Sequence, residues 1–165
     1  MTTKSRRHHL KGSETKKLFQ QLKQKLGIDI NQEYETKPRV EVEETENADV
    51  FFLNGDPLLA KTDGELFPTL SYEKVIVSLP KIVVDMGAIP YVCKGADVMA
   101  PGITQVNGEF TEKTLILIVD ERHGKPLAIG LSLCSSEEMK TADRGKVVKN
   151  LHYVGDRIWA CIKGS

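Results

Sequence analysis

Residues Val92–Ile103 read VCKGADVMAPGI, and this stretch decides how the second half of the chain folds. Gly95 and Gly102 bracket a short apolar run, and Lys94 lies beside the first glycine. Pro101 precedes the second glycine. Glycine is the usual residue where the backbone turns sharply or where a ligand approaches it closely. The stretch therefore predicts either a tight corner in a β-rich domain or a site that lets a partner reach the backbone.

Short apolar runs, separated by turn residues, surround this stretch on both sides. Short runs rich in Val and Ile and bounded by Gly, Asp or Pro are typical of strands. We expect strands at Lys81–Asp85, Asp97–Ala100, Thr114–Asp120, Leu127–Cys134 and Lys146–Tyr153. The turn Arg122–Lys125 joins two of them as a hairpin and exposes His123. After a turn at Gly155-Asp156, a last strand at Arg157–Ile162 is expected to close the chain as a second hairpin.

Two short helices are expected among these strands. One covers Ala88–Lys94, where Pro90 argues against a longer helix. The other starts at Ser135, whose spacing to Glu138 indicates a capping box, and runs to about Thr141. Many short strands with two small helices and regular turns predict a compact, curled β-barrel.

The first part of the chain has a different pattern. A polar tail precedes a helix that we expect to begin at Ser13 and to stop at Gly27. Strands follow at Arg39–Glu43 and Asp49–Leu53, and the Asn54-Gly55 turn leads to a returning strand at Leu58–Ala60. The fold class predicted is therefore α+β. It divides into a small α+β domain over residues 1–76 and a β-barrel domain over residues 77–163.

Composition restricts the setting of this protein. The chain is 40% hydrophobic and 28% charged, which is typical of an ordinary folded protein, and no apolar run is long enough to span a membrane. No signal peptide is apparent at the basic start. The three cysteines, Cys93, Cys134 and Cys161, are far apart, and none belongs to a C-x-x-C motif. This pattern favours the reducing cytoplasm over a disulfide framework.

Charge is strongly segregated although the net charge is zero. Residues 1–27 are basic, from Lys4 to Lys25, with Glu14 as the single acid, whereas residues 28–50 are mainly acidic. The basic segment is suited to a polyanion, and the acidic segment would repel one. The alternative is that both are ordinary solvated faces.

The second half of the chain resembles a PUA domain, the RNA-binding module named for pseudouridine synthases and archaeosine transglycosylases. The resemblance rests on Asp85–Ala88, Lys94–Val98, Ala100–Ile103, Ala128–Gly130, Glu137–Gly145 and Asn150–Tyr153, with Asp156 and Trp159. It extends upstream through Leu53–Gly55, Phe67–Leu70 and Leu79-Pro80, which are similar to the pre-PUA half of the malignant T-cell amplified sequence family.

The resemblance implies a PUA-type pseudobarrel whose helix, glycine-rich loop and closing strand bind structured RNA. It implies partners in translation: tRNA or rRNA, the small ribosomal subunit and an initiation-factor-like protein. The step would be initiation, reinitiation or recycling. No catalytic domain accompanies the PUA-like part, so the resemblance implies no modification chemistry. The alternative is an accessory module that binds a protein through the acidic segment Glu33–Asp49. We expect a cytoplasmic monomer.

The candidate RNA-binding residues combine cations, open backbone and mixed hydrogen-bonding groups. Glycine frees amide N–H groups, lysine attracts phosphate, and Asp97 could either accept a base amino group or hold the loop. The closing strand offers a polar face suited to RNA, or simply to solvent. The candidates are Lys94, Gly95, Ala96, Asp97, Pro101, Gly102, Lys146, Lys149, Asn150, His152, Arg157, Arg6 and Arg7.

Signals for catalysis, metal or cofactor binding are missing from the sequence. No serine has a G-x-S-x-G setting, and neither a Walker loop nor a G-x-G-x-x-G motif occurs. His8 and His9 are adjacent, so their side chains point apart on a helix or a strand. No third ligand lies nearby in the sequence, as a metal site would require. We therefore expect no enzyme activity, no cofactor and no metal.

Overall fold

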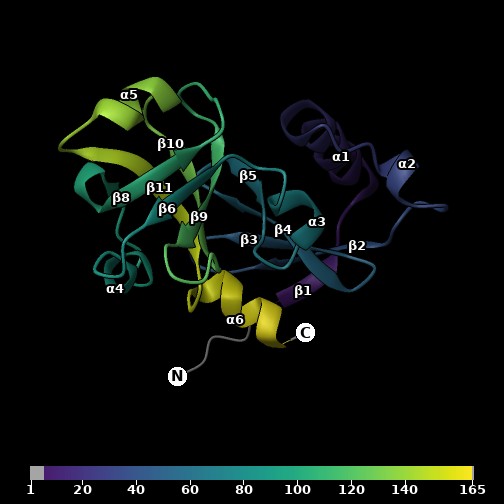
Figure 1. The fold of residues 1–165 in the computed structure, drawn as a ribbon. Helices are drawn as coiled ribbons and strands as arrows, with labels where there is room; N and C mark the ends of the chain where they lie inside the picture. Colours follow the sequence, from purple (N-terminus) through teal and green to yellow (C-terminus); the bar gives the residue numbers. More distant parts are fainter. Residues whose placement is uncertain (1–5, 165) are drawn as a thin grey trace.

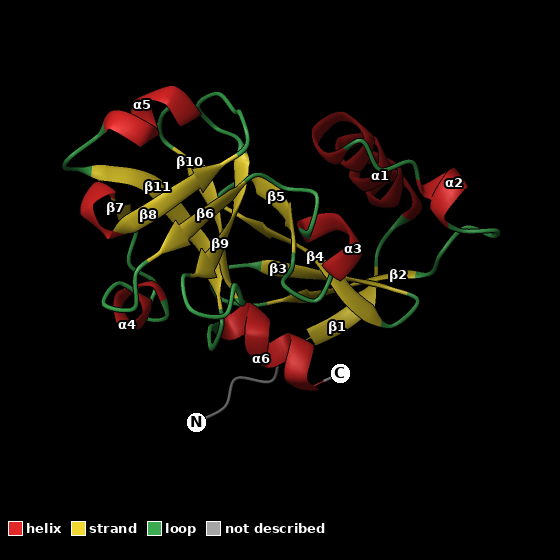
Figure 2. Ribbon diagram, in the orientation of Figure 1, coloured by secondary structure: helices red, strands yellow, loops and turns green. Residues whose placement is uncertain are grey.

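The computed structural model describes residues 6–164 and consists of two sheets that meet at a shared core (Figures 1 and 2). The first sheet has the strand order β1-β2-β3-β4-β5 and is antiparallel throughout. Its strands are β1 (Arg6–His9), β2 (Val40–Glu44), β3 (Asp49–Leu53), β4 (Asp56–Thr62) and β5 (Glu65–Pro68). The helices of this part are α1 (Gly12–Leu26), α2 (Ile30–Glu33) and α3 (Glu73–Ile76).

The second sheet has the order β7-β11-β10-β9-β6-β8 and curls into a half-barrel. Only β6 and β9 pair in parallel; its other neighbours are antiparallel. Its strands are β6 (Lys81–Val84), β7 (Val98–Met99), β8 (Ile103–Asn107), β9 (Leu115–Asp120), β10 (Pro126–Ser132) and β11 (Lys146–Tyr153). Its helices are α4 (Ile89–Val92), the 3-10 turn η1 (Ala100–Gly102), α5 (Ser136–Thr141) and α6 (Arg157–Gly164). The α+β class and the PUA-type barrel predicted from the sequence are confirmed.

Alternation along β3 explains how the first sheet is covered on both faces. Phe51 and Leu53 pack with Leu18 and Leu22 of α1, while Val50 and Phe52 face the second sheet. Successive strand side chains point to opposite faces, so one strand serves two cores. The expected Asn54-Gly55 turn is confirmed, since both residues have positive φ, 51° and 88°.

A single hydrophobic cluster joins the two sheets. It includes Phe52 and Phe67 from the first sheet, Leu117 and Ile129 from the second, and Ile158 from α6. Because this core draws on both halves, the domain boundary at residues 76 and 77 stays a prediction.

A buried histidine adds hydrogen bonds to this junction. His152 is 0% exposed; its Nε2 accepts the backbone N–H of Leu70 at 3.2 Å, and its Nδ1 lies 2.9 Å from Asp156 Oδ2. Nε2 must be unprotonated to accept, so Nδ1 carries the proton and donates it to the carboxylate. The ring also stacks on Phe67, with 6.2 Å between centroids. The expectation that His152 faces RNA is therefore wrong.

The segment Arg157–Ile162 is a helix and not the strand of a closing hairpin. Asp156 starts α6 by accepting the backbone N–H of Trp159 at 2.7 Å and that of Tyr153 at 2.9 Å. The Trp159 amide lies in the first turn of α6, where it has no partner within the helix, so a side chain that accepts it favours a helix start. The apolar residues of α6 then pack against the shared core.

The start of the described chain is a strand where the sequence indicated a polar tail. In β1, Arg6 and Arg7 pair in register with Glu44 and Glu43 of β2. Arg7 lies 4.0 Å from Glu43 and His8 lies 3.9 Å from Glu44, so the basic and acidic segments meet at this point. Lys4 of the predicted basic segment lies outside the described residues.

Three smaller differences concern element boundaries. The first helix begins at Gly12, with Lys11 at the cap position, so Ser13 lies inside it; it stops as predicted at Gly27, whose φ is 67°. Strand β8 was not expected, because ITQVN is mostly polar and its side chains are largely exposed. Helix α4 is only one turn long, consistent with Pro90.

Gly130 offers a test of how tightly the half-barrel is packed. A Cβ at this position would lie 2.4 Å from Val148 Cγ1 and 2.9 Å from the carbonyl oxygen of Lys149. We expect Gly130→Ala to lower the free energy of unfolding by about 1–3 kcal/mol in urea denaturation, as overpacking does. Gly12→Ala is the control, since its Cβ would meet nothing within 4 Å. Equal stability of the two variants would contradict the described packing of β10 on β11.

Candidate nucleic-acid interface

A groove of about 660 Å³ opens between α4, β7 and η1. The VCKGADVMAPGI stretch forms most of its wall, and Lys146 at the start of β11 stands at its side. Six predicted residues line it: Gly95, Ala96, Asp97, Pro101, Gly102 and Lys146. The sequence motif therefore marks a real hollow at the surface and is more than a corner.

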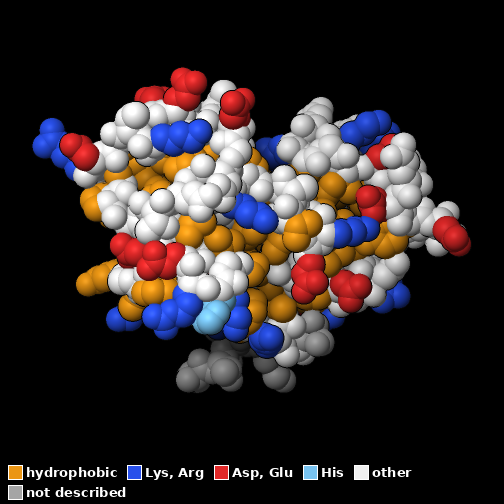
Figure 3. All heavy atoms as spheres, in the orientation of Figure 1, with side chains coloured by type: hydrophobic (Ala, Val, Ile, Leu, Met, Phe, Trp, Pro, Cys, Tyr) orange, Lys and Arg blue, Asp and Glu red, His pale blue; other side chains and the backbone are white. Residues whose placement is uncertain are grey.

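The walls of the groove are apolar and unusually exposed. Tyr91 on α4 is 68% exposed and Met99 on β7 is 46% exposed, and both line the groove. Figure 3 shows apolar side chains at the surface around α4. Exposed aromatic rings are platforms on which nucleic-acid bases stack. Sequence reasoning missed Tyr91, because in the run AIPYV it resembles a core residue, whereas α4 buries Val92 and leaves Tyr91 exposed.

Asp97 and Asn150 hold the loop in place. Asp97 Oδ1 accepts the backbone N–H of Asn150 at 2.9 Å, and its Oδ2 lies 3.6 Å from Lys146 Nζ. The Asn150 amide donates to the carbonyl oxygens of Val92 and Ala96, each at 3.0 Å. Asn150 therefore serves the loop in this structure, while Asp97 combines loop support with a place in the groove wall.

Gly95 and Gly102 are each required to be glycine for a different structural reason. Gly95 has φ +96°, and a Cβ there would lie 3.1 Å from the Tyr153 ring. A Cβ on Gly102 would lie 3.2 Å from the Cβ of Ala88. Gly95 thus allows a turn with left-handed backbone next to the Tyr153 ring, and Gly102 allows η1 to approach the segment before α4.

The remaining candidates lie outside the groove. Lys94 is exposed at the end of α4. Lys149 lies 3.6 Å from Asp63 of the first half, which links the two parts of the molecule. Arg157 and Arg7 line a separate hollow of about 260 Å³ with Glu43 and Cys161. The guanidinium of Arg7 lies 3.9 Å from the centroid of Phe52, so it has a packing role.

The hollow of Arg7 and Arg157 contains a cysteine that is unsuited to nucleophilic chemistry. Cys161 Sγ donates to Glu43 Oε2 at 2.7 Å. Burial, together with this carboxylate, raises the pKa of the Cys161 thiol to about 12. The thiolate is the reactive form, so a raised pKa makes the group inert.

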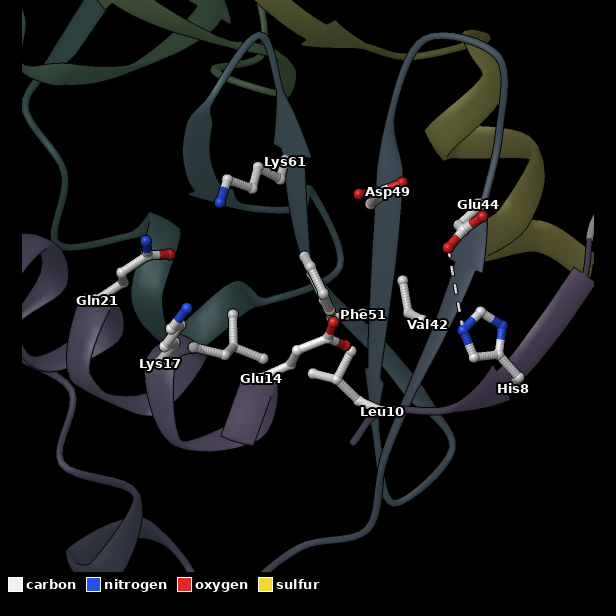
Figure 4. A pocket seen from close by; sticks show the side chains of 11 residues that line it. His8, Leu10, Glu14, Lys17, Gln21, Val42, Glu44, Asp49, Phe51 and Lys61 are labelled. Carbon is white, nitrogen blue, oxygen red and sulfur yellow. Dashed lines mark ion pairs between the residues drawn. The ribbon is translucent and has the colours of Figure 1, made fainter. Parts of the chain in front are cut away.

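Figure 4 shows another hollow, of about 300 Å³, between α1 and the strands of the first sheet. Glu14 and Lys17 of α1 face Asp49, Glu44 and Lys61 of the strands. Burial and the nearby Glu44 raise the pKa of Asp49. Three acids, Glu14, Glu44 and Asp49, thus face two lysines in this hollow.

Two further observations concern metal binding and membrane-spanning helices. Within residues 6–164, no three His, Cys, Asp or Glu side chains come together in a way that could hold a metal ion. In the same part of the chain, no helix combines the length and apolar character needed to cross a membrane.

Comparison with known families agrees with this geometry. Residues 80–154 match the PUA domain, and residues 6–73 match a domain of unknown function, DUF1947. The chain belongs to the family of PUA-domain proteins in which a DUF1947 domain of the pre-PUA type precedes the PUA domain.

Relatives of this kind occur in archaea and eukaryotes. An uncharacterized protein of Methanocaldococcus jannaschii is 38% identical, over 88% of this chain and 92% of the relative. Translation machinery-associated protein 20 of Schizosaccharomyces pombe is 32% identical, over 68% of this chain and 66% of its own length. Malignant T-cell-amplified sequence 1 of Rattus norvegicus is 30% identical, over 69% of this chain and 65% of its own. The chain thus aligns with just under two thirds of each eukaryotic relative.

Solved structures show the same arrangement. A hypothetical protein of Pyrococcus horikoshii has a TM-score of 0.74 at 34% identity, with 94% of this chain and 98% of that chain covered. A PUA-domain protein of Aeropyrum pernix has a TM-score of 0.76 over 97% of this chain and 92% of its own. At 22% identity, the second comparison concerns the fold alone.

The geometry at Gly95 separates its structural role from that of its neighbour. We expect Gly95→Ala to lower the free energy of unfolding by about 1 kcal/mol or more, because alanine is strained at positive φ. Lys94→Glu changes an exposed side chain and should leave the melting temperature unchanged. Thermal unfolding of both variants checks this, and a Gly95→Ala variant as stable as the parent would contradict the left-handed turn.

Proposed function

We propose that this protein binds structured RNA through the α4 groove and acts in translation. The observation that carries the proposal is that the exposed ring of Tyr91 lines one groove with Lys146 and the Gly95–Gly102 loop, in a domain of the PUA family. An apolar platform next to a cation fits a base and its phosphate together. The name of the fungal relative, translation machinery-associated protein 20, supports the setting.

The finer partners are also proposals. Transfer RNA or ribosomal RNA is the RNA class we propose, on the small ribosomal subunit and with an initiation-factor-like protein. The role would lie in initiation, reinitiation or recycling, carried out by a cytoplasmic monomer.

We further propose that the groove binds and does not catalyse. Its described lining contains no serine, threonine, cysteine or histidine, so no nucleophile is paired with a base there. The alternative of a protein partner on the acidic segment has less support, since Glu43 and Glu44 already face Arg7 and His8 at 4.0 and 3.9 Å.

Tyr91 tests the proposal most simply. We expect Tyr91→Ala to weaken affinity for a tRNA transcript by about 1–3 kcal/mol, roughly five- to hundredfold, because a stacking platform is lost. Tyr91→Phe keeps the ring and should bind as the parent does. Fluorescence anisotropy measures both.

The control is Val77→Ala, another apolar side chain that is 62% exposed but lies outside the groove lining. Loss of affinity in Val77→Ala but not in Tyr91→Ala would place the binding surface elsewhere.

A further inference from the structure

In residues 6–164, four strands lie at the edges of the two sheets, and three of them are protected against pairing with another chain. An edge strand offers unpaired backbone groups, and charge, proline or short length usually protects it. Strand β1 reads RRHH and is basic, β5 begins at Glu65 and ends at Pro68, and β7 has two residues. Strand β8 reads ITQVN and has none of these features. Of the four edges, only that of β8 is open to pairing with a further strand.

The backbone of Val106, in β8, points away from the sheet. On the β9 side of β6, the carbonyl oxygens of Pro80 and Val84 accept backbone N–H groups at 2.9 and 3.1 Å. Because alternate residues of a strand point to opposite neighbours, Ile82 also faces β9 and makes no ladder bond to Val106, its register partner. The N–H and C=O groups of Val106 therefore face outward, and no loop or turn backbone in the range 6–164 bonds to them.

An apolar strip accompanies this free edge. Ile103 and Val106 are half-buried and pack against the core cluster of the half-barrel, which also contains Met139 of α5. Helix α5 lies next to β8 (Figure 1). The three other side chains of β8 are polar and exposed. A strand added along β8 would therefore cover the half-buried pair with apolar side chains on one face and keep polar side chains on the other.

Acidic side chains gather just beyond the end of β8. Glu109 and Glu112 follow the strand, α5 adds Glu137 and Glu138, and all four are exposed. Burial, followed by the nearby Glu138 and Glu112, raises the pKa of the Cys134 thiol, so carboxylates of the loop and of α5 share one corner. Figure 3 shows acidic side chains at the top of the molecule, over α5 and the loop beside it.

This acidic corner is not neutralised by neighbouring cations. None of its four glutamates forms an ion pair with a residue in the range 6–164. The loop 108–114 and α5 together contain two lysines against these four acids. The corner would repel a phosphate backbone and attract a basic polypeptide.

We propose that β8 is a docking edge for an extended, basic segment of a partner protein, which adds to the sheet as a further strand beside Val106. Outward N–H and C=O groups are complementary to another extended backbone, and the acidic corner favours a lysine or arginine at the end of that segment. A second copy of β8 would offer ITQVN, which contains no base. The inference is independent of the proposed RNA site, since no residue of β8 lines the α4 groove.

The test selects peptides from a random library displayed on phage against the full chain, and then uses a synthetic copy of the most enriched peptide. We expect enriched sequences to alternate β-branched with polar residues and to contain lysine or arginine. In hydrogen exchange followed by NMR, this peptide should slow exchange of the Val106 amide about tenfold or more and leave the Ile82 amide, which faces β9, unchanged. No enriched peptide, or protection only at other amides, would overturn the inference.

Two variants of one residue separate the backbone from the side chain. Val106→Ala loses the side chain but keeps the N–H, whereas Val106→Pro also loses the N–H, and proline is tolerated where a strand N–H faces solvent. We expect Val106→Pro to bind the peptide about fivefold more weakly than Val106→Ala, in isothermal titration calorimetry. Melting temperatures of the two variants within a few degrees of each other show that the fold persists. Equal affinities would contradict pairing through the edge.

A charge reversal tests the acidic corner. Glu109→Lys/Glu112→Lys should weaken peptide binding about tenfold or more, because two attractive charges become repulsive. The matched control is Glu35→Lys/Glu46→Lys, which makes the same change in net charge at exposed residues of the first half. Equal losses in the two double variants would indicate net charge alone and overturn the acidic corner.

Two results would assign the edge to another occupant. A parent dimer in sedimentation equilibrium that Val106→Pro converts to a monomer would make a second copy the occupant and overturn the proposed partner. Protection of the Val106 amide by a tRNA transcript would assign the edge to RNA and overturn it as well.

Discussion

The N–H of Leu70, near the end of the first half, donates to Nε2 of the buried His152 on the last strand of the second sheet. The opposite ring nitrogen donates to Asp156, and that carboxylate also accepts the N–H of Trp159 in the first turn of α6. A buried polar group must keep its partners or cost about 1–3 kcal/mol, so this chain of bonds tolerates little change. It fixes the first half, β11 and α6 relative to one another. The position of Arg157 at the surface follows from it, because α6 starts where Asp156 directs it.

The sequence predicts much of this fold because local signals agree with the tertiary structure. The apolar runs of β9 and β10 and the glycine at position 27 suffice to place strands and a helix end. The prediction fails at Arg157–Ile162, because the apolar spacing there is compatible with either a strand or a helix. The side chain of Asp156, which caps the helix, decides between the two. The prediction also fails at β1, since RRHH has no apolar alternation and becomes a strand only by pairing with the acids of β2. His152 resembles a surface residue because its partner at position 70 is far away in the sequence.

The candidate site is predicted in part for the same reason. Glycine and proline in VCKGADVMAPGI indicate a special backbone, and the groove forms there. What the motif cannot indicate is exposure: α4 buries Val92 and leaves the adjacent Tyr91 at the surface. The acidic and basic segments, in contrast, are conspicuous in the sequence but partly neutralise one another in the sheet.

The central claim is that RNA lies in the α4 groove. Ultraviolet crosslinking of the full chain to a tRNA transcript, followed by mass spectrometry of the crosslinked peptides, tests it most directly. The account predicts crosslinks within residues 85–102. Crosslinks confined to α1 or to the acidic strand β2 would contradict it.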